Sequence, residues 1–301
     1  MIKKNIDKPM EERTIRAITG MNRLQFEEMV FTFEKVLRET TSRKRKRVEG
    51  GGRKGRLRNA REKLFFILFY FKVYPVYDLA GFLWKVDRSQ VCRWVAKLLP
   101  KLEKTLGYSC CLPKRKIHSV EELRESFPEV FDFFIDVTER KCQRPNKSEK
   151  NLKRRYSGKK KMHTRKNTVI VDENKRFLYV SPTKNGKIHD FKMFKKEVLA
   201  KIFPEGSCVW VDKGYQGIKS LMDEQIQVAI PYKKKKKEKL SPMEKKENRA
   251  INQIRVVVEH AIGGMKRMAC CQVPIRNRNS KIEDKIPFLA AGLWNFHLAR
   301  K

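Results

Sequence analysis

Apolar residues recur at helical spacing through the first third of the chain. A stripe of roughly 3.6-residue period predicts a helix over residues 10–38, and its members are Phe26, Met29, Val30, Phe33 and Leu37. Residues 61–73, REKLFFILFYFKV, predict a strongly apolar helix, and Pro75 lies where another helix can begin. We therefore expect this part of the chain to be all-helical.

A helix, a tight turn and a second helix are predicted next. Residues 77–84 read YDLAGFLW, and Asp87 then begins a capping-box-like start with Gln90 three residues on. One face of the second helix is apolar, through Val91, Trp94, Val95 and Leu98. The polar residues left outward are Arg88, Ser89, Gln90, Arg93 and Lys97. This pattern favours a helix-turn-helix that reads the DNA major groove, and an ordinary three-helix packing unit is the alternative.

After Pro113 the pattern changes from helical to strand-like. Strands are predicted over residues 130–138, 166–172, 176–182, 208–212 and 226–232, with a hairpin around Glu173 and Asn174. Helices are predicted over residues 189–203 and 241–268. The order is three strands followed by strands alternating with helical segments, which indicates an α/β domain.

Charge changes the picture more than any other property of the composition. The 301 residues include 71 Lys and Arg against 34 Asp and Glu, for a net charge of +37. Such a surface attracts polyanions, so nucleic acid is the expected partner. A lysine-rich source could account for only a few of these charges. Hydrophobic residues make up 40% of the chain, enough for a packed core.

Other classes of protein are disfavoured. The chain has no apolar run of about eighteen residues and no apolar signal-peptide stretch, so no membrane span is expected. Its seven cysteines suit neither a disulfide framework nor a C-x-x-C zinc site. We expect reduced thiols, as in a cytosolic or nuclear protein.

Three basic segments interrupt the predicted elements. Residues 43–58 carry nine basic residues, one acid and the triple glycine 50–52. This segment could contact a DNA backbone, act as a nuclear-import tract or serve as a solvated linker. Lys233–Lys237 repel one another, which favours a solvated loop that either follows DNA phosphates or is only a spacer. Lys159–Lys161 leave the same choice open.

Three carboxylates are placed where a metal site could form. Asp136 lies within or at the end of an apolar strand, Asp212 ends the strand CVWVD, and Glu259 lies in the last long helix. Carboxyl ends of buried strands are where open α/β sheets build sites. Such oxygens suit two Mg²⁺ or Mn²⁺ ions. Arg255 and Lys266 share a helix face with Glu259, although Arg255–Glu259 could equally be a surface pair.

The motifs around these acids resemble those of DDE-type transposases. They are IDVTE, VDKGYQG, the later Arg255-x3-Glu259-x6-Lys266 and NGKIHDF at 185–191. The resemblance is nearest to the insertion-sequence-5 group and its Harbinger-like relatives, and it covers roughly residues 60–300. It implies a ribonuclease-H-like fold with Asp136, Asp212 and Glu259 as catalytic metal ligands. It also implies that Arg255 and Lys266 are accessory cations near the DNA.

Two details of the motifs stay open. Asn252 occupies a place that often holds tyrosine in related insertion sequences, which puts the details of end recognition in doubt. His189 and Asp190 are interpreted as a buried, hydrogen-bonded structural pair.

Together these patterns predict a mixed α/β, ribonuclease-H-like protein preceded by an all-α helix-turn-helix. The expected parts are a helical segment and basic linker at 1–60, a DNA-binding domain at 61–112 and a catalytic domain at 113–301. We expect a metal-dependent transposase acting on double-stranded DNA as a dimer or higher assembly, in the nucleoid or the nucleus. A domesticated DNA-binding protein and a nuclease without strand transfer are the alternatives.

Overall fold

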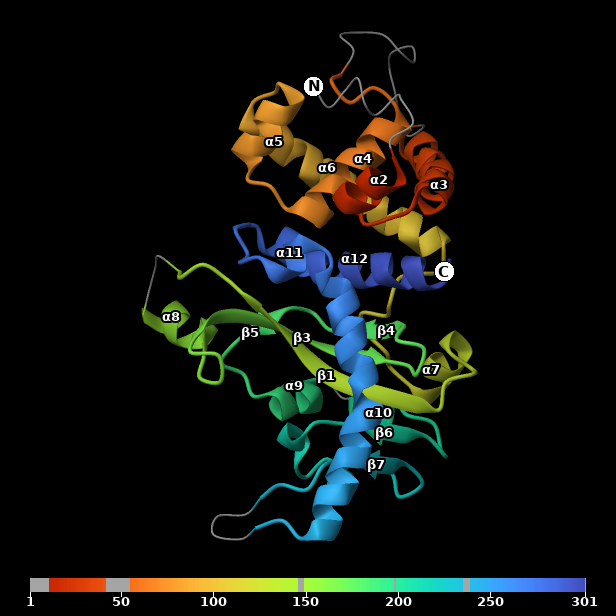
Figure 1. Ribbon diagram of the computed structural model, residues 1–301, viewed down its shortest axis with the longest axis vertical. Helices are drawn as coiled ribbons and strands as arrows, with labels where there is room; N and C mark the ends of the chain where they lie inside the picture. The colour runs from red at the N-terminus through yellow and green to blue at the C-terminus, as the bar shows by residue number, and fades with distance from the viewer. Residues whose placement is uncertain (1–10, 42–54, 146–148, 198, 235–238, 301) are drawn as a thin grey trace. The chain divides into compact units, whose positions relative to one another are not determined.

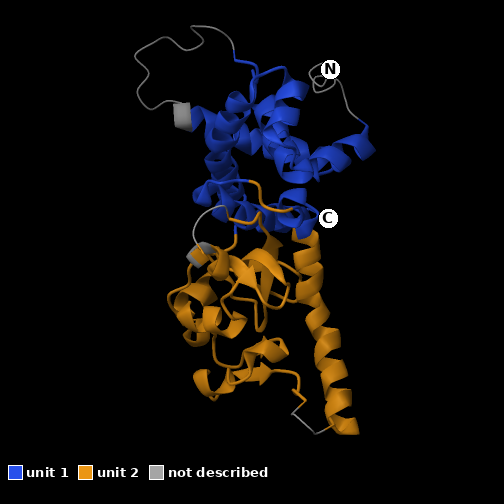
Figure 2. Ribbon diagram, turned by 90° about the vertical axis from the view of Figure 1, so that its left-hand side faces the viewer, with its two compact units in different colours: residues 1–112, 266–273, 277–301 blue, residues 113–265, 274–276 orange. Residues whose placement is uncertain are grey.

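The chain forms two compact units. The computed structural model describes residues 11–41, 55–145, 149–197, 199–234 and 239–300. Unit 1 contains residues 1–112, 266–273 and 277–301, and unit 2 contains residues 113–265 and 274–276 (Figure 2). Most of the basic segment 43–58 and part of Lys233–Lys237 lie outside the described residues.

Helices build unit 1. Those described are α2 (Glu12–Thr19), α3 (Arg23–Thr41), α4 (Ala60–Val73), α5 (Tyr77–Trp84), α6 (Arg88–Tyr108), α11 (Ala269–Gln272) and α12 (Ser280–Leu298) (Figure 1). The apolar helix α4 is buried on nearly all sides and packs against α2, α3, α6 and α11. A helix that is hydrophobic all round belongs at the centre of its domain, so α4 organises this unit.

The predicted helix over residues 10–38 is in fact two helices. Gly20 ends α2 with a backbone φ of 82°, a left-handed conformation that favours glycine. A reciprocal capping box then starts α3: the Gln25 N–H donates to Asn22 Oδ1 at 2.8 Å, and the Asn22 N–H donates to Gln25 Oε1 at 3.1 Å. The apolar stripe did not reveal this break, because all of its residues lie in α3.

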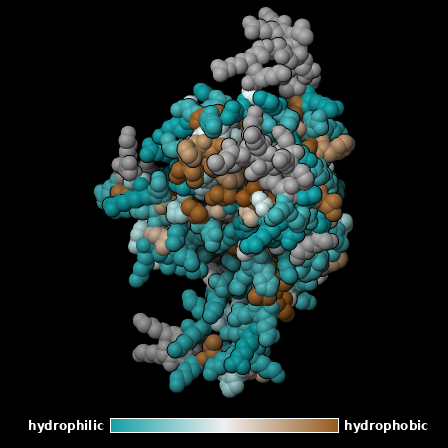
Figure 3. Space-filling model, turned by 45° about the horizontal axis from the view of Figure 1, so that its top comes forward, coloured by the Kyte–Doolittle hydropathy of each residue, from teal (hydrophilic) through white to brown (hydrophobic). Residues whose placement is uncertain are grey.

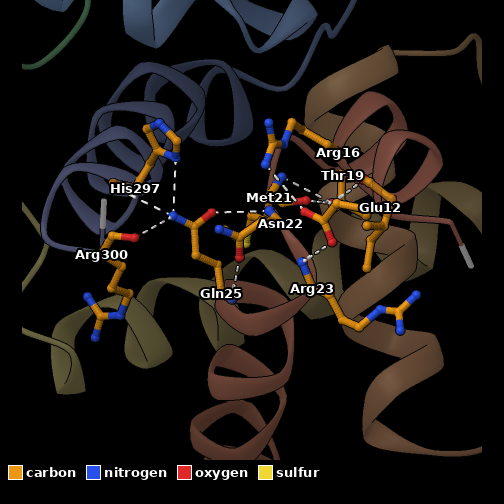
Figure 4. A network of polar contacts seen from close by, with 10 residues as sticks. Glu12, Arg16, Thr19, Met21, Asn22, Arg23, Gln25, His297 and Arg300 are labelled. Atoms are coloured by element: carbon orange, nitrogen blue, oxygen red, sulfur yellow. Dashed lines mark hydrogen bonds and ion pairs between the residues drawn. The ribbon is translucent and has the colours of Figure 1, made fainter. Parts of the chain in front are cut away.

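The C-terminal helix α12 packs within unit 1, which departs from the expected catalytic domain over residues 113–301. Figure 4 shows Gln25 Nε2 directed at the end of α12, where it contacts His297 Nδ1 at 3.3 Å and the Arg300 carbonyl at 3.3 Å. Asn295 donates to the Cys111 carbonyl at 3.0 Å. The apolar residues of α12 are buried against α6. These distant contacts join the two ends of the chain in one helical unit.

Helices α5 and α6 form the predicted helix-turn-helix. Asp87 caps α6 by accepting a hydrogen bond from the Ser89 N–H at 2.7 Å. The expected role of Gln90 in this cap is wrong, because Gln90 Oε1 instead accepts from Arg93 at 3.0 Å. Val91, Val95 and Leu98 are buried as expected.

A mixed sheet forms the centre of unit 2. In the described residues its strands are β1 (Asp132–Lys141), β2 (Tyr156–Ser157), β3 (Met162–Val171), β4 (Phe177–Val180), β5 (Lys184–Asn185), β6 (Cys208–Trp210) and β7 (Gln227–Ala229). Strand β3 pairs antiparallel with both β4 and β1. Strand β6 pairs in parallel with β1 on its other side, and β7 pairs in parallel with β6. This order confirms the predicted ribonuclease-H-like architecture.

Helices and short 3₁₀ turns flank the sheet. The helices are α7 (Val120–Ser126), α8 (Glu149–Arg155), α9 (Asp190–Lys196) and α10 (Pro242–Lys266), and the turns are Leu199–Lys201, Lys213–Tyr215 and Lys219–Leu221. The predicted helix over 189–203 is shorter than expected and ends at Lys196. In both Figure 1 and Figure 2, α10 runs along one side of the sheet.

Alternation along the strands sorts the side chains of unit 2 into two faces. Phe133, Ile135 and Val209 join a buried cluster that includes Phe194 and Tyr215. Asp132, Phe134 and Asp136 occupy the alternate positions of β1, and the Phe134 ring stacks on Trp210 of β6 with centroids 5.9 Å apart. Asp136 therefore lies on a strand that the core holds firmly in place.

Polar residues dominate the face of the molecule drawn in Figure 3. Hydrophilic residues cover most of the face drawn in Figure 3, with hydrophobic residues in smaller groups between them. No helix in the described residues is long and apolar enough to cross a membrane. All seven cysteines are free thiols, as expected.

Candidate functional site

Strand pairing brings two of the predicted acids near one another. β1 and β6 are parallel neighbours, and the last register pair is Phe134 opposite Trp210. Asp136 and Asp212 each stand two residues beyond that pair, and the effect of the Asp212 carboxylate on the pKa of Asp136 shows that the two acids are neighbours. The acids are 76 positions apart in sequence, and the pairing of two short strands removes that separation.

Helix α10 supplies a buried cation to this pair. Arg255 is only 6% exposed, and its guanidinium lies 3.7 Å from Asp212 Oδ1. The sequence left open whether Arg255 simply pairs with Glu259 on the helix surface. In the structure its ion pair is with Asp212, which supports the interpretation of Arg255 as part of the site.

The electrostatics show that the acids form one neighbourhood. Burial is the main reason that the pKa of Asp136 lies above its ordinary value. The carboxylates of Asp212 and Asp190 raise that pKa further. The Val137 N–H, which donates to Asp136 Oδ1 at 2.7 Å, and the Arg255 guanidinium act in the opposite direction. Asp136 is thus a partly buried acid with other acids nearby.

Glu259 is not brought into this neighbourhood in the structure. It is exposed on α10, about one helical turn beyond Arg255. Lys266 is the last residue of α10 and is partly exposed. In the described part of the chain no group of three or more His, Cys, Asp or Glu side chains is arranged to hold a metal ion. The role of Glu259 as a third metal ligand therefore stays a prediction.

Asp136 and Asp212 nevertheless fit a divalent cation. Carboxylate oxygens are the ligands that Mg²⁺ and Mn²⁺ prefer. Mutual repulsion contributes to the raised pKa of Asp136, and a bound cation would relieve it. The chemistry of these two groups is thus that of a cation site in need of further ligands.

The interpretation of His189 and Asp190 as a buried pair is wrong. His189 is exposed and forms no side-chain cap on α9. Asp190 instead forms an ion pair with Lys166, whose Nζ lies 2.9 Å from Asp190 Oδ1. Lys166 is on β3, and its buried ammonium needs a counter-charge more than an exposed imidazole does.

The sequence did not identify Lys166 or Tyr215 as part of this region. Tyr215 belongs to the VDKGYQG motif, but only Asp212 of that motif was assigned a role. A lysine inside an apolar strand, as in KNTVIV, was a signal that a buried partner should exist. The identity of that partner depends on the fold.

The predicted DNA-reading residues lie at the start of α6. Arg88, Ser89 and Arg93 are exposed, and Gln90 is partly buried. Arg93 donates to Ser89 Oγ at 3.4 Å and to Gln90 Oε1 at 3.0 Å. Arg88 lies 3.7 Å from Asp78 of α5. These are weak surface contacts, so the side chains are free to exchange them for DNA.

Comparisons with known proteins agree with both the catalytic region and the helix-turn-helix described above. Residues 135–295 match the family described as DDE superfamily endonuclease, and residues 55–107 match the helix-turn-helix of DDE superfamily endonuclease. The chain is 30% identical over 296 residues to a Microchaete diplosiphon protein named "Probable transposase for insertion sequence element IS702", with 98% of each chain covered. No solved structure gives a significant match. With more than half of its residues matched by the endonuclease model, the chain belongs to the DDE superfamily endonucleases.

Proposed function

We propose that this chain is a DNA transposase. It would hydrolyse a phosphodiester at the ends of its element, and the freed 3′-hydroxyl would then attack target DNA. Three findings support this: the endonuclease family, the helix-turn-helix and a relative of nearly equal length that is named a probable transposase. Placement in the insertion-sequence-5 or Harbinger-like group remains a prediction from the motifs.

The proximity of Asp136 and Asp212 is the observation on which the proposed chemistry depends. We propose that these two carboxylates hold Mg²⁺ or Mn²⁺ and that Glu259 completes the ligand set. Two such ions, when bound, would activate the attacking oxygen and stabilise the leaving oxygen. Arg255 would hold the Asp212 carboxylate in position, and Lys266 would neutralise DNA phosphates near the end of α10.

The helix-turn-helix would recognise the element ends. Arg88, Ser89, Gln90 and Arg93 stand at the start of the second helix, which is the end that contacts bases in this motif. Cutting two ends together requires at least two copies of the chain, so we propose a dimer or higher assembly on DNA. The reaction would take place wherever the DNA is kept, in a nucleoid or a nucleus.

A cleavage assay tests the proposal. The full chain is incubated with Mg²⁺ or Mn²⁺ and duplex DNA that carries the element ends. Asp136→Asn and Asp212→Asn should each reduce cleavage to background, because each removes a charged oxygen ligand without changing side-chain size. Glu224→Gln, an exposed acid outside the site, makes the same change in charge and should leave cleavage intact. Undiminished cleavage by both aspartate variants would refute the mechanism.

Product analysis separates the alternatives. A transposase should yield molecules in which an element end is joined to target DNA. Cleaved ends without joined products would identify a nuclease without strand transfer. Binding of the ends without any cleavage by the wild-type chain would identify a domesticated DNA-binding protein.

A further inference from the structure

A buried lysine anchors the segment that carries Asp190. Lys166 is 5% exposed, and its Nζ contacts the Ile188 carbonyl at 3.1 Å as well as Asp190 Oδ1 at 2.9 Å. Breaking a buried ion pair leaves an uncompensated charge, so this contact resists displacement. The loop before α9 is therefore fastened to β3 at the residue where the helix begins.

The same segment is held to β3 at a second place. Arg165 donates to Asn185, and the Gly186 N–H donates to the Thr164 carbonyl at 3.1 Å. A Cβ on residue 186 would lie 2.0 Å from Thr164 Oγ1 and 2.9 Å from two backbone carbonyl oxygens, so only glycine fits this approach. These contacts explain why Asn185, Gly186 and Asp190 occur together in one short motif.

Helix α9 packs against Tyr215, which ends the short turn that follows Asp212. The Tyr215 ring packs edge-to-face against Phe191 and Phe194 of α9, with centroids 6.2 and 5.9 Å apart. Tyr215 is 1% exposed, and in the described residues its hydroxyl has no hydrogen-bond partner. Burial raises its pKa well above the ordinary value, and among the acids that raise it further Asp136 has the largest effect.

An unpartnered hydroxyl in this position needs an explanation. Burying a polar group without a hydrogen bond costs free energy, so such groups are rare unless a ligand or a functional state satisfies them. Here the acids close enough to raise the Tyr215 pKa carry carboxylates, which are strong acceptors. A hydroxyl that donates a hydrogen bond to a carboxylate ligand fixes the orientation of that ligand in a metal site.

We propose that Tyr215 is a positioning residue of the metal site, and that the Lys166–Asp190 ion pair anchors the helix that holds it. When a cation is bound, the Tyr215 hydroxyl would donate to the Asp136 carboxylate and fix its orientation. This inference rests on the proposed function, because it requires Asp136 and Asp212 to bind the metal. It assigns a role to the last residue of Asp212-Lys-Gly-Tyr215 and to Asp190.

Mn²⁺ titration of the full chain, followed by the electron paramagnetic resonance of free Mn²⁺, tests this role. Tyr215→Phe keeps the ring packing and removes only the hydroxyl. It should weaken Mn²⁺ binding about 10- to 100-fold, the usual effect of losing a group that orients a ligand. The melting temperature of the metal-free protein should stay equal or rise, since no hydrogen bond is lost. Asp190→Asn should weaken Mn²⁺ binding by a smaller factor.

Two controls make the result decisive. Tyr179→Phe removes another buried tyrosine hydroxyl from the same unit and should leave Mn²⁺ affinity unchanged. If Tyr215→Phe binds Mn²⁺ as tightly as wild type while Asp212→Asn does not, the positioning role is overturned and the proposed metal site stands. If Asp212→Asn also binds like wild type, the metal is not held there and both proposals fail. Equal losses in Tyr179→Phe and Tyr215→Phe would show a merely structural effect and overturn the role.

Discussion

The acidic side chains of this protein differ in burial and in neighbouring charges, although all of them are carboxylates. Asp136 is partly buried, and its pKa is raised. Glu259 is exposed on α10. Asp172 is fully buried, and Arg176 holds it at the turn between β3 and β4 with an Nε–Oδ2 distance of 2.9 Å. A buried carboxylate is costly unless it is compensated, so each of these burials needs a structural or functional reason.

Glu197 offers a test of this cost away from the metal site. Burial raises its pKa above the ordinary 4.5, although the Thr168 and Ser181 hydroxyls and the Lys184 ammonium act the other way. Between pH 4.5 and the folded pKa, Glu197 therefore keeps a proton in the folded state that it loses in the unfolded state. Stability falls as pH rises from 4.5 through the folded pKa and then levels off.

Replacement of Glu197 by Gln should consequently stabilise the protein at pH 8 by a few degrees in melting temperature. The gain should vanish below pH 4.5, where wild type is protonated in both states. Melting curves across this pH range check the prediction. Glu224→Gln controls for the change in net charge, and a stability difference that does not vary with pH would contradict the electrostatic explanation.

At the scale of elements, short strands do more positioning than long helices. β5 consists of Lys184 and Asn185 and pairs with β3 through two residues. It nevertheless sets where α9 starts. The close approach at Gly186 makes this placement possible, and a side chain there would separate β5 from β3.

Gly186→Ala should therefore lower the free energy of unfolding by about 1–3 kcal/mol, as overpacking usually does. A Cβ at residue 186 meets two backbone carbonyls that cannot move as a flexible side chain would. Gly158→Ala is the matched control, because nothing lies within 4 Å of its added Cβ. Urea denaturation of both variants checks the prediction, and equal stabilities would show that the segment adapts without strain.

At the scale of the whole molecule, charge and connectivity matter most. A net charge of +37 destabilises a compact chain by self-repulsion unless a polyanion is bound. Unit 1 is closed by α12, which arrives from the far end of the sequence and contacts α3 through Gln25 and His297. The helical unit thus depends on residues on both sides of the sheet domain in sequence.

DNA binding should weaken steeply with salt. Each phosphate neutralised by Lys or Arg releases a counterion, so the logarithm of the association constant should fall linearly with the logarithm of salt concentration. The expected slope is about −0.9 for each phosphate contacted. Arg93→Gln should reduce the magnitude of this slope by about one if its side chain contacts a phosphate. Fluorescence anisotropy at several salt concentrations measures it, and a flat response would contradict the electrostatic argument.

Much of the fold could be predicted because its signals are local. Strand alternation, the apolar helices of unit 1 and the order of elements in unit 2 follow from periodicities of a few residues. Asp136 and Asp212 could be singled out because they end or lie within apolar strands, where side chains that share a site are common. The break at Gly20 is local too, but a stripe confined to α3 concealed it.

The sequence by itself determined the elements, the charge and the candidate acids. Only the tertiary structure decided that Asp136 and Asp212 are neighbours, because they are brought together by the pairing of β1 with β6, two strands far apart in the chain. It alone decided that Asp190 pairs with Lys166, that Tyr215 packs on α9 and that α12 joins unit 1. Such contacts depend on which buried charges and apolar faces meet in space, and no local periodicity records that.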